Sequence, residues 1–220
     1  MSKYIETMFP IDETSPSSYP QKLCSYISSK FYPYQGKLLD VGCGKGNHML
    51  AFFRLGHPVY GIDLEPINPL VKKCDIEIEK FPYPNDYFDF VFSKSVLEHV
   101  WNTDNFISEV KRVLKPNGVC VIIVPDWESQ HSYYWDDPWH VKAFTRRGLQ
   151  YLFEIADFKD VKCIWFRQLP FLWKHPWLVF IPKIISILPE CCKWRDNEKR
   201  KPYKLIRFSK EKMLLLSAIK

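Results

Sequence analysis

The stretch that decides the fold runs from Leu38 to Gly46 and reads Leu-Leu-Asp-Val-Gly-Cys-Gly-Lys-Gly. Its apolar beginning, within residues 37–41, predicts a short buried strand of a parallel sheet. The glycines let the backbone approach a ligand closely, where a Cβ atom would collide. The helix expected to follow, residues 47–55, would direct unpaired N–H groups toward that ligand. This stretch therefore predicts a ligand-binding loop between a strand and a helix.

A carboxylate stands at the end of the next predicted strand, residues 59–63. Asp63 follows Gly42 by 21 residues, and a carboxylate in that place can accept hydrogen bonds from ribose hydroxyls. An adenosine-containing ligand is therefore expected. A nicotinamide cofactor is an alternative, because its fingerprint is G-x-G-x-x-G with an acid about 20 residues on. Against it, this chain has G-x-G-x-G, with Asn47 in place of the third glycine of that fingerprint.

Apolar runs and helical patterns alternate along most of the chain, which favours an α/β fold whose ligands bind at the carboxyl ends of the strands. Besides those above, the expected elements are helices at 21–32, 105–114 and 146–156, and strands at 88–92, 119–124, 161–166 and 213–219. We expect one domain over residues 1–220. Its parts would be a cofactor-binding core at 21–166, an insertion at 167–212 and a last strand at 213–220.

Several segments, in order, resemble motifs of the class I S-adenosylmethionine-dependent methyltransferases, of the type that acts on small molecules. They are Leu38–Gly46, Gly61–Asp63, Cys74–Val91, Ser95–Val100 with Val113–Gly118, and His140–Leu149. The resemblance covers about residues 36–166. It implies a Rossmann-like, seven-stranded and mostly parallel sheet with helices on both faces and an insertion before the last strand. It also implies S-adenosylmethionine as the cofactor.

The same resemblance implies which residues hold this cofactor, all of them near strand ends. The loop residues Asp40, Gly42, Cys43, Gly44 and Gly46 would face its methionine part, Asp63 its ribose, Asp75 and Ile76 its adenine, and Ser93, with Lys94 and Ser95, its sulfonium. No metal ligands are expected.

Two histidines are candidate catalytic residues. The methyl group of a sulfonium is already activated, so the protein must chiefly hold the acceptor in line and exclude water. A hydroxyl acceptor also has to lose its proton, and histidine is the base best suited to neutral pH. His99 follows the strand at 88–92, and His140 follows an aromatic and acidic loop after the strand at 119–124. Both are therefore expected at the ligand edge of the sheet.

The insertion at 167–212 is aromatic first and basic afterwards. Prolines and lysines interrupt its apolar part, residues 171–189, so a transmembrane helix is not expected. Residues 170–220 carry 12 Lys and Arg against 4 Asp and Glu, in a chain of net charge +6. Two readings stay open: a lid packed on the domain itself, or peripheral contact of residues 171–212 with a membrane surface.

Composition and charge argue against several other classes of protein. The seven cysteines form no C-x-x-C pair, which disfavours a disulfide framework or a zinc site. Residues 1–20 lack a secretory pattern, so we expect a location in the cytoplasm, either free or peripheral at the membrane surface. The core is slightly acidic, so no nucleic acid partner is expected. We expect methyl transfer to a small-molecule, sugar or lipid-linked acceptor, at a hydroxyl; a non-catalytic cofactor-binding protein is the alternative.

Overall fold

The computed structural model describes residues 18–66, 70–196 and 201–220. The expectation of a cytoplasmic location is based on residues 1–20, and most of these lie outside the described residues. Residues 197–200, in the basic half of the insertion, lie outside them as well. One sheet holds seven strands in the order β3-β2-β1-β4-β5-β9-β6. The strands are β1 (Leu38–Val41), β2 (Val59–Asp63), β3 (Val71–Lys73), β4 (Phe88–Lys94), β5 (Leu114–Pro125), β6 (Lys159–Phe166) and β9 (Met213–Ile219).

The sheet is parallel except for its last strand in sequence. Strands β1 to β5 pair in parallel, and β9 lies between β5 and β6, antiparallel to both. The carboxyl ends of β1, β2, β4, β5 and β6 therefore lie at one edge. The expected Rossmann-like, seven-stranded and mostly parallel sheet is confirmed.

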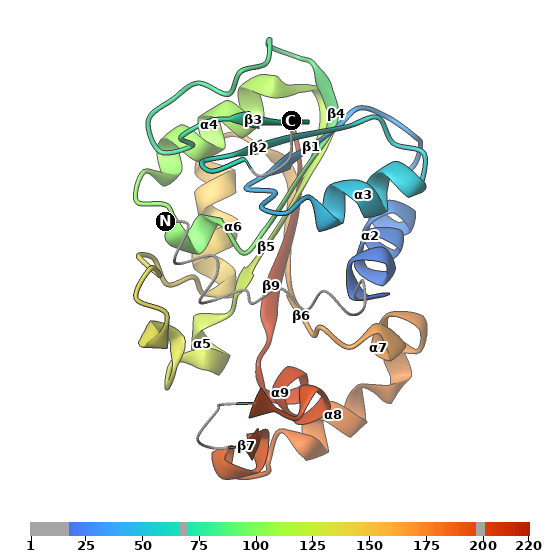
Figure 1. The fold of residues 1–220 in the computed structure, drawn as a ribbon, viewed down its shortest axis with the longest axis vertical. Helices are drawn as coiled ribbons and strands as arrows, with labels where there is room; N and C mark the ends of the chain where they lie inside the picture. Colours follow the sequence, from blue (N-terminus) through green and yellow to red (C-terminus); the bar gives the residue numbers. More distant parts are fainter. Residues whose placement is uncertain (1–17, 67–69, 197–200) are drawn as a thin grey trace.

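Helices cover both faces of the sheet (Figure 1). Alternate residues of β4 show why, because side chains of a strand point to opposite faces in turn. Phe90 and Phe92 pack with residues of α2 and α3, whereas Val91 packs with those of α4 and α6. The four helices are α2 (Ser18–Phe31), α3 (Asn47–Arg54), α4 (Thr103–Val113) and α6 (Arg146–Ile155).

Two strands differ from the sequence-based expectation. β3 was not expected, because its Val71-Lys72-Lys73 sequence has a single apolar residue; its pairing with β2 defines it. β5 begins at Leu114, where the end of a helix was expected. Leu114 pairs with Phe88, and regular pairing resumes at Val119 after an irregularity in register. Residues 115–118, between the expected helix and the expected strand at 119–124, are thus an irregular part of β5.

The insertion leaves the sheet at the ends of β5 and β6, because Met213 pairs with both Pro125 and Phe166. It lies below the sheet in Figure 1, in orange and red. Its elements are α7 (Pro170–Lys174), η3 (Pro176–Val179), α8 (Phe180–Ile185), η4 (Glu190–Lys193), β7 (Trp194–Asp196), β8 (Lys201–Pro202) and α9 (Lys204–Lys210). Three short helices come earlier in the chain, namely η1 (Leu97–His99), α5 (Trp127–Gln130) and η2 (Tyr134–Asp136). Among the described helices, none has the length and apolar character needed to cross a bilayer.

Candidate functional site

The loop between β1 and α3 is built on glycines in the left-handed region. Gly42, Gly44 and Gly46 have φ values of 70°, 51° and 74°. A Cβ atom on Gly42 would overlap the side chain of Val96, so the loop packs directly on the segment after β4. A Cβ atom on Gly44 would meet no described atom within 4 Å. The loop thus packs against the segment after β4 on one side and borders open space at Gly44.

Asp40 stands at the carboxyl half of β1 with a buried and unsatisfied carboxylate. The residue is 2% exposed, and its Oδ2 atom has no hydrogen-bond partner among the described residues. Burial, and next the charge of Asp63, raise the pKa of Asp40 from 3.8 to about 8. A buried polar atom without a partner is costly. A ligand that donates a hydrogen bond to Asp40 would remove this cost, as an ammonium group can.

Asp63, at the end of β2, holds the loop and keeps capacity for a ligand. Its Oδ2 accepts a hydrogen bond from the Gly44 N–H at 2.7 Å, and its Oδ1 accepts one from the Glu65 N–H at 3.1 Å. An ionised carboxylate has about four lone-pair sites, so two remain. Asp63 is half-buried. It can therefore accept the two hydroxyls of a ribose, as the sequence predicts.

The turn after β3 lies alongside the end of β2, because the N–H of Cys74 donates to the carbonyl oxygen of Asp63 at 3.0 Å. Asp75 accepts the N–H of Glu77 through its Oδ1 at 3.0 Å. Ile76 is half-buried against the core. The structure thus brings Asp63, Asp75 and Ile76 to one region, and the adenine contact stays a prediction.

Cys43 and Ser93 lie beside the loop, with their side chains turned to the protein. Cys43 is buried with Met49, and burial raises the pKa of its thiol. Ser93 is buried, and its Oγ donates to the Val41 carbonyl at 2.9 Å, which ties β4 to β1. The backbone of Cys43 is engaged as well, since its N–H donates to the Ile62 carbonyl oxygen at 3.2 Å and its carbonyl oxygen accepts from the Gly46 N–H at 2.9 Å. The hydroxyl hydrogen of Ser93 is already used, so its predicted contact with the cofactor remains untested.

The two candidate catalytic histidines face each other. Their ring centroids lie 4.9 Å apart. His99 Nδ1 lies 3.0 Å from the carbonyl oxygen of Trp139, and His140 Nδ1 lies 2.6 Å from that of Tyr134. A carbonyl only accepts, so each Nδ1 carries the hydrogen and each neutral ring presents Nε2 as the basic atom. Burial is the main cause that lowers the pKa of His99, which favours its neutral form.

Glu98 completes this pair and was not a sequence-predicted site residue. It is 1% exposed, and its Oε2 has no hydrogen-bond partner among the described residues. Burial raises its pKa from 4.5 to about 8. One ligand atom from each of Glu98, His99 and His140 lies within 4.8 Å of the others. Three such groups can share a proton or hold a divalent cation. An acid beside His99 at a strand end was the signal that could have identified it.

The loop between β1 and α3, which we call the donor loop, lies next to the cluster of Glu98, His99 and His140. Val96, against which Gly42 packs, begins the segment that carries Glu98 and His99. The N–H groups of Val141 and Lys142 donate to the Glu98 carbonyl oxygen at 2.9 and 3.1 Å. These bonds bring the loop after β5 onto the segment after β4.

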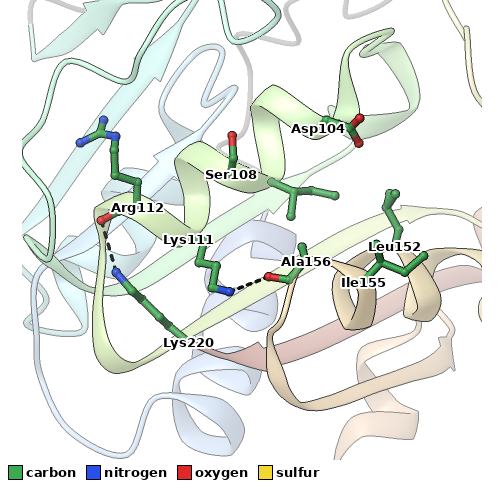
Figure 2. A pocket seen from close by; sticks show the side chains of 9 residues that line it. Asp104, Ser108, Lys111, Arg112, Leu152, Ile155, Ala156 and Lys220 are labelled. Carbon is green, nitrogen blue, oxygen red and sulfur yellow. Dashed lines mark hydrogen bonds between the residues drawn. The ribbon is translucent and has the colours of Figure 1, made fainter.

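A surface groove of about 520 Å³ lies elsewhere, between α4 and α6 (Figure 2). Its cations already have partners in the protein. Lys111 donates to the Ala156 carbonyl oxygen at 2.7 Å. Lys220 donates to the Leu114 carbonyl at 2.7 Å and pairs with Asp86. The groove borders the start of β5, the edge opposite the donor loop. Both lysines are therefore engaged within the protein.

Comparison with known proteins shows similarity to methyltransferases. A methyltransferase-domain model matches residues 39–122. A ubiquinone biosynthesis O-methyltransferase of Rhodopseudomonas palustris (strain HaA2) is 31% identical over 106 residues, 42% of this chain and 42% of that protein. A sterol 4-C-methyltransferase of Caenorhabditis elegans is 29% identical over 127 residues, 51% of this chain and 37% of that protein. The match spans less than half the length of these curated relatives.

The fold is also shared with solved structures. A SAM-dependent methyltransferase from Archaeoglobus fulgidus superposes with a TM-score of 0.66 at 20% identity, over 100% of this chain and 99% of the other. This likeness concerns the fold.

Proposed function

We propose that this chain, whose residues 39–122 match a methyltransferase domain, is a class I S-adenosylmethionine-dependent methyltransferase that transfers a methyl group to a hydroxyl of a small-molecule acceptor. Binding of the methyl donor is supported chiefly by the buried Oδ2 of Asp40, which has no hydrogen-bond partner among the described residues, and by the open space at Gly44. When bound, S-adenosylmethionine supplies a methyl group activated on a sulfonium. Asp40 would accept from its ammonium group, and Asp63 from its ribose hydroxyls.

The choice of a hydroxyl rests on the His99 and His140 pair. Both rings are fixed by their Nδ1 hydrogen bonds, so Nε2 is the atom of each ring that could take a proton. His140 Nε2 lies 3.8 Å from Asp137 Oδ2, a carboxylate that would stabilise the proton once transferred. A positioned base of this kind contributes about 10²–10⁴-fold to a rate. Glu98 has a ligand atom within 4.8 Å of those of both rings. Its pKa is raised to about 8 by burial, so it would favour an imidazolium on either ring only where it has lost its own proton. We assign His140 as the base and His99 as the group that orients the hydroxyl.

The acceptor class follows from the side chains around His140. Its ring lies 4.4 Å from that of Tyr134, which is itself 5.1 Å from Trp135. Aromatic walls around a single basic atom suit an acceptor with an apolar ring and one reactive hydroxyl. The ubiquinone relative acts at an oxygen and the sterol relative at a carbon, by their names. The base pair favours oxygen for this chain, and sugar or lipid-linked hydroxyls belong to the same proposal.

Release of S-adenosylhomocysteine tests the proposal. The full chain would be incubated with S-adenosylmethionine and a panel of phenols, sugars and lipid-linked alcohols, with and without EDTA. The proposal expects acceptor-dependent release that His140→Ala lowers at least a hundredfold in kcat at saturating acceptor. His131→Ala is the matched control, because His131 is an exposed histidine of the same loop.

Each outcome decides between the hypotheses. Full turnover by His140→Ala would contradict its role as the base. Binding of S-adenosylhomocysteine without turnover of any acceptor would favour a non-catalytic binding protein. Activity abolished by EDTA and restored by a divalent cation would favour a metal held by Glu98, His99 and His140 over a proton acceptor. Binding of NADH in place of S-adenosylhomocysteine would favour the oxidoreductase alternative.

A further inference from the structure

The insertion presents a run of apolar side chains to solvent. Five of them lie within the segment from η3 to the end of the turn after α8. Their exposed fractions are 69% for Trp177, 49% for Phe180, 64% for Ile184, 81% for Ile187 and 41% for Leu188. Phe180 and Ile184 lie one turn apart on α8 and so share a face, and the Trp177 ring of η3 lies 6.4 Å from that of Phe180. Ile187 and Leu188 follow in the turn after α8. A contiguous exposed face of this kind marks a contact with a partner or a membrane.

The opposite side of the insertion is anchored to the domain. Trp173, next to this face, stacks on Phe166 at 5.2 Å and lies 5.3 Å from Tyr26 of α2. Lys210 of α9 donates to the carbonyl oxygens of Leu188 and Ser186 at 2.6 and 3.0 Å. The segment is therefore fixed from within, and its apolar face stays outward instead of folding onto the core as a lid would.

Positive charge surrounds this face without negative charge. Lys174 and Lys183 are exposed beside it, and Lys204 is exposed on α9. No Asp or Glu occurs from residue 167 to residue 189. The first acid after it, Glu190, is engaged by Lys210 at 3.1 Å and by Lys193 at 3.5 Å. Among residues 167–193, which the structure describes, the outward charge next to the apolar face is therefore basic.

This charge pattern favours a membrane over a second copy of the chain as the partner of the apolar face. In a symmetric dimer the same surface meets itself, and Lys174 and Lys183 of two copies would approach each other with no acid to neutralise them. An anionic bilayer complements both features at once, because lysines bind its headgroups while Trp and Phe enter the interface. We propose that the face formed by Trp177, Phe180, Ile184, Ile187 and Leu188 docks the protein on an anionic membrane surface.

Docking in this orientation has a consequence for the reaction. The insertion leaves the sheet at the carboxyl ends of β5 and β6, the edge that also carries the donor loop. Lys212 and Asp126 join its base to the end of β5, with 3.6 Å between Nζ and Oδ2. A membrane-bound protein would thus hold its reactive edge on the membrane side, which suits an apolar acceptor delivered from lipid. Only this consequence rests on the proposed methyl transfer; the docking itself does not.

Vesicle sedimentation tests the docking, with neither donor nor acceptor present. The full chain would be mixed with vesicles of phosphatidylcholine alone, or of phosphatidylcholine with 30% phosphatidylglycerol, at low and high salt. We expect binding to the anionic vesicles that high salt weakens. The triple variant Trp177→Ala, Phe180→Ala, Ile184→Ala should lower the partition coefficient about a hundredfold. Lys174→Ala and Lys183→Ala should each lower it about fivefold.

A matched control keeps these changes interpretable. Phe53→Ala with Ile155→Ala removes two side chains that are 67% and 83% exposed on other helices, and it should leave the partition coefficient unchanged. Three results would overturn the proposal. They are absence of binding by the wild-type chain, equal binding by the triple variant, and a wild-type dimer that the triple variant converts to a monomer.

Discussion

Replacing Asp40 by Asn tests the donor site through stability as well as through binding. The substitution keeps the shape of the side chain and removes its charge. In the protein without ligand, the pKa of Asp40 is raised to about 8 from 3.8, chiefly by burial. An acid whose folded pKa lies above its unfolded pKa is more protonated when folded, so the free energy of unfolding falls as pH rises from about 4 to about 8.

The size of the effect follows from that shift. From pH 3.8 to pH 7 is roughly three pH units, and each corresponds to about 1.36 kcal/mol. The wild-type carboxylate therefore costs about 4 kcal/mol of stability at pH 7. An Asn side chain in the same place keeps unpartnered polar atoms, which cost about 1–3 kcal/mol. We expect Asp40→Asn to stabilise the ligand-free protein at pH 7 by about 1–3 kcal/mol, with no gain at pH 4.

Urea unfolding at a series of pH values, without cofactor, measures this difference directly. The stability of Asp40→Asn minus that of the wild type should rise by about 1.36 kcal/mol per pH unit between pH 4 and pH 8. Calorimetry should show that the same variant binds S-adenosylhomocysteine at least tenfold more weakly. A variant that is less stable at every pH, or that binds the ligand as the wild type does, would refute this reasoning.

Three further predictions concern neighbouring parts of the structure. Gly44→Ala should cost only about 1–2 kcal/mol of stability, from its left-handed backbone, yet weaken S-adenosylhomocysteine binding in calorimetry; Gly42→Ala should cost more in urea unfolding, because its methyl group would overlap Val96. Glu98→Gln should raise the stability of the ligand-free protein at pH 7.5 but not at pH 4, since burial raises the pKa of Glu98 to about 8. Lys193→Ala should cost about 3–5 kcal/mol in thermal or urea unfolding, because Lys193 is 1% exposed and pairs with buried Glu211 at 3.0 Å; unchanged stability would contradict it.

Local sequence was sufficient wherever an apolar run ended in a glycine or an acid. The strand before Gly42 and the one that ends at Asp63 were predicted from such patterns, because burial on both faces requires near-continuous apolar residues. β3 could not be predicted in this way. Val71-Lys72-Lys73 carries no strand pattern, and only its pairing with β2 places it in the sheet.

In the candidate site too, the parts set by local sequence were predicted and the parts set by long-range packing were not. The Asp40 to Gly46 loop is local, so its position between a strand and a helix was predicted. The role of Glu98 depends on long-range packing, because its backbone is held by Val141 and Lys142 from another segment. Sequence also gave no means to choose between a lid and an outward face for the insertion, since that depends on Trp173 packing against α2 and Phe166.

The measurement that tests the central claim most directly is calorimetric titration of the full chain with S-adenosylhomocysteine and, separately, with NADH. The account predicts one molecule of S-adenosylhomocysteine bound per chain, weakened by Asp40→Asn and by Asp63→Asn, and no heat of binding for NADH. Saturable binding of NADH with none of S-adenosylhomocysteine would contradict it.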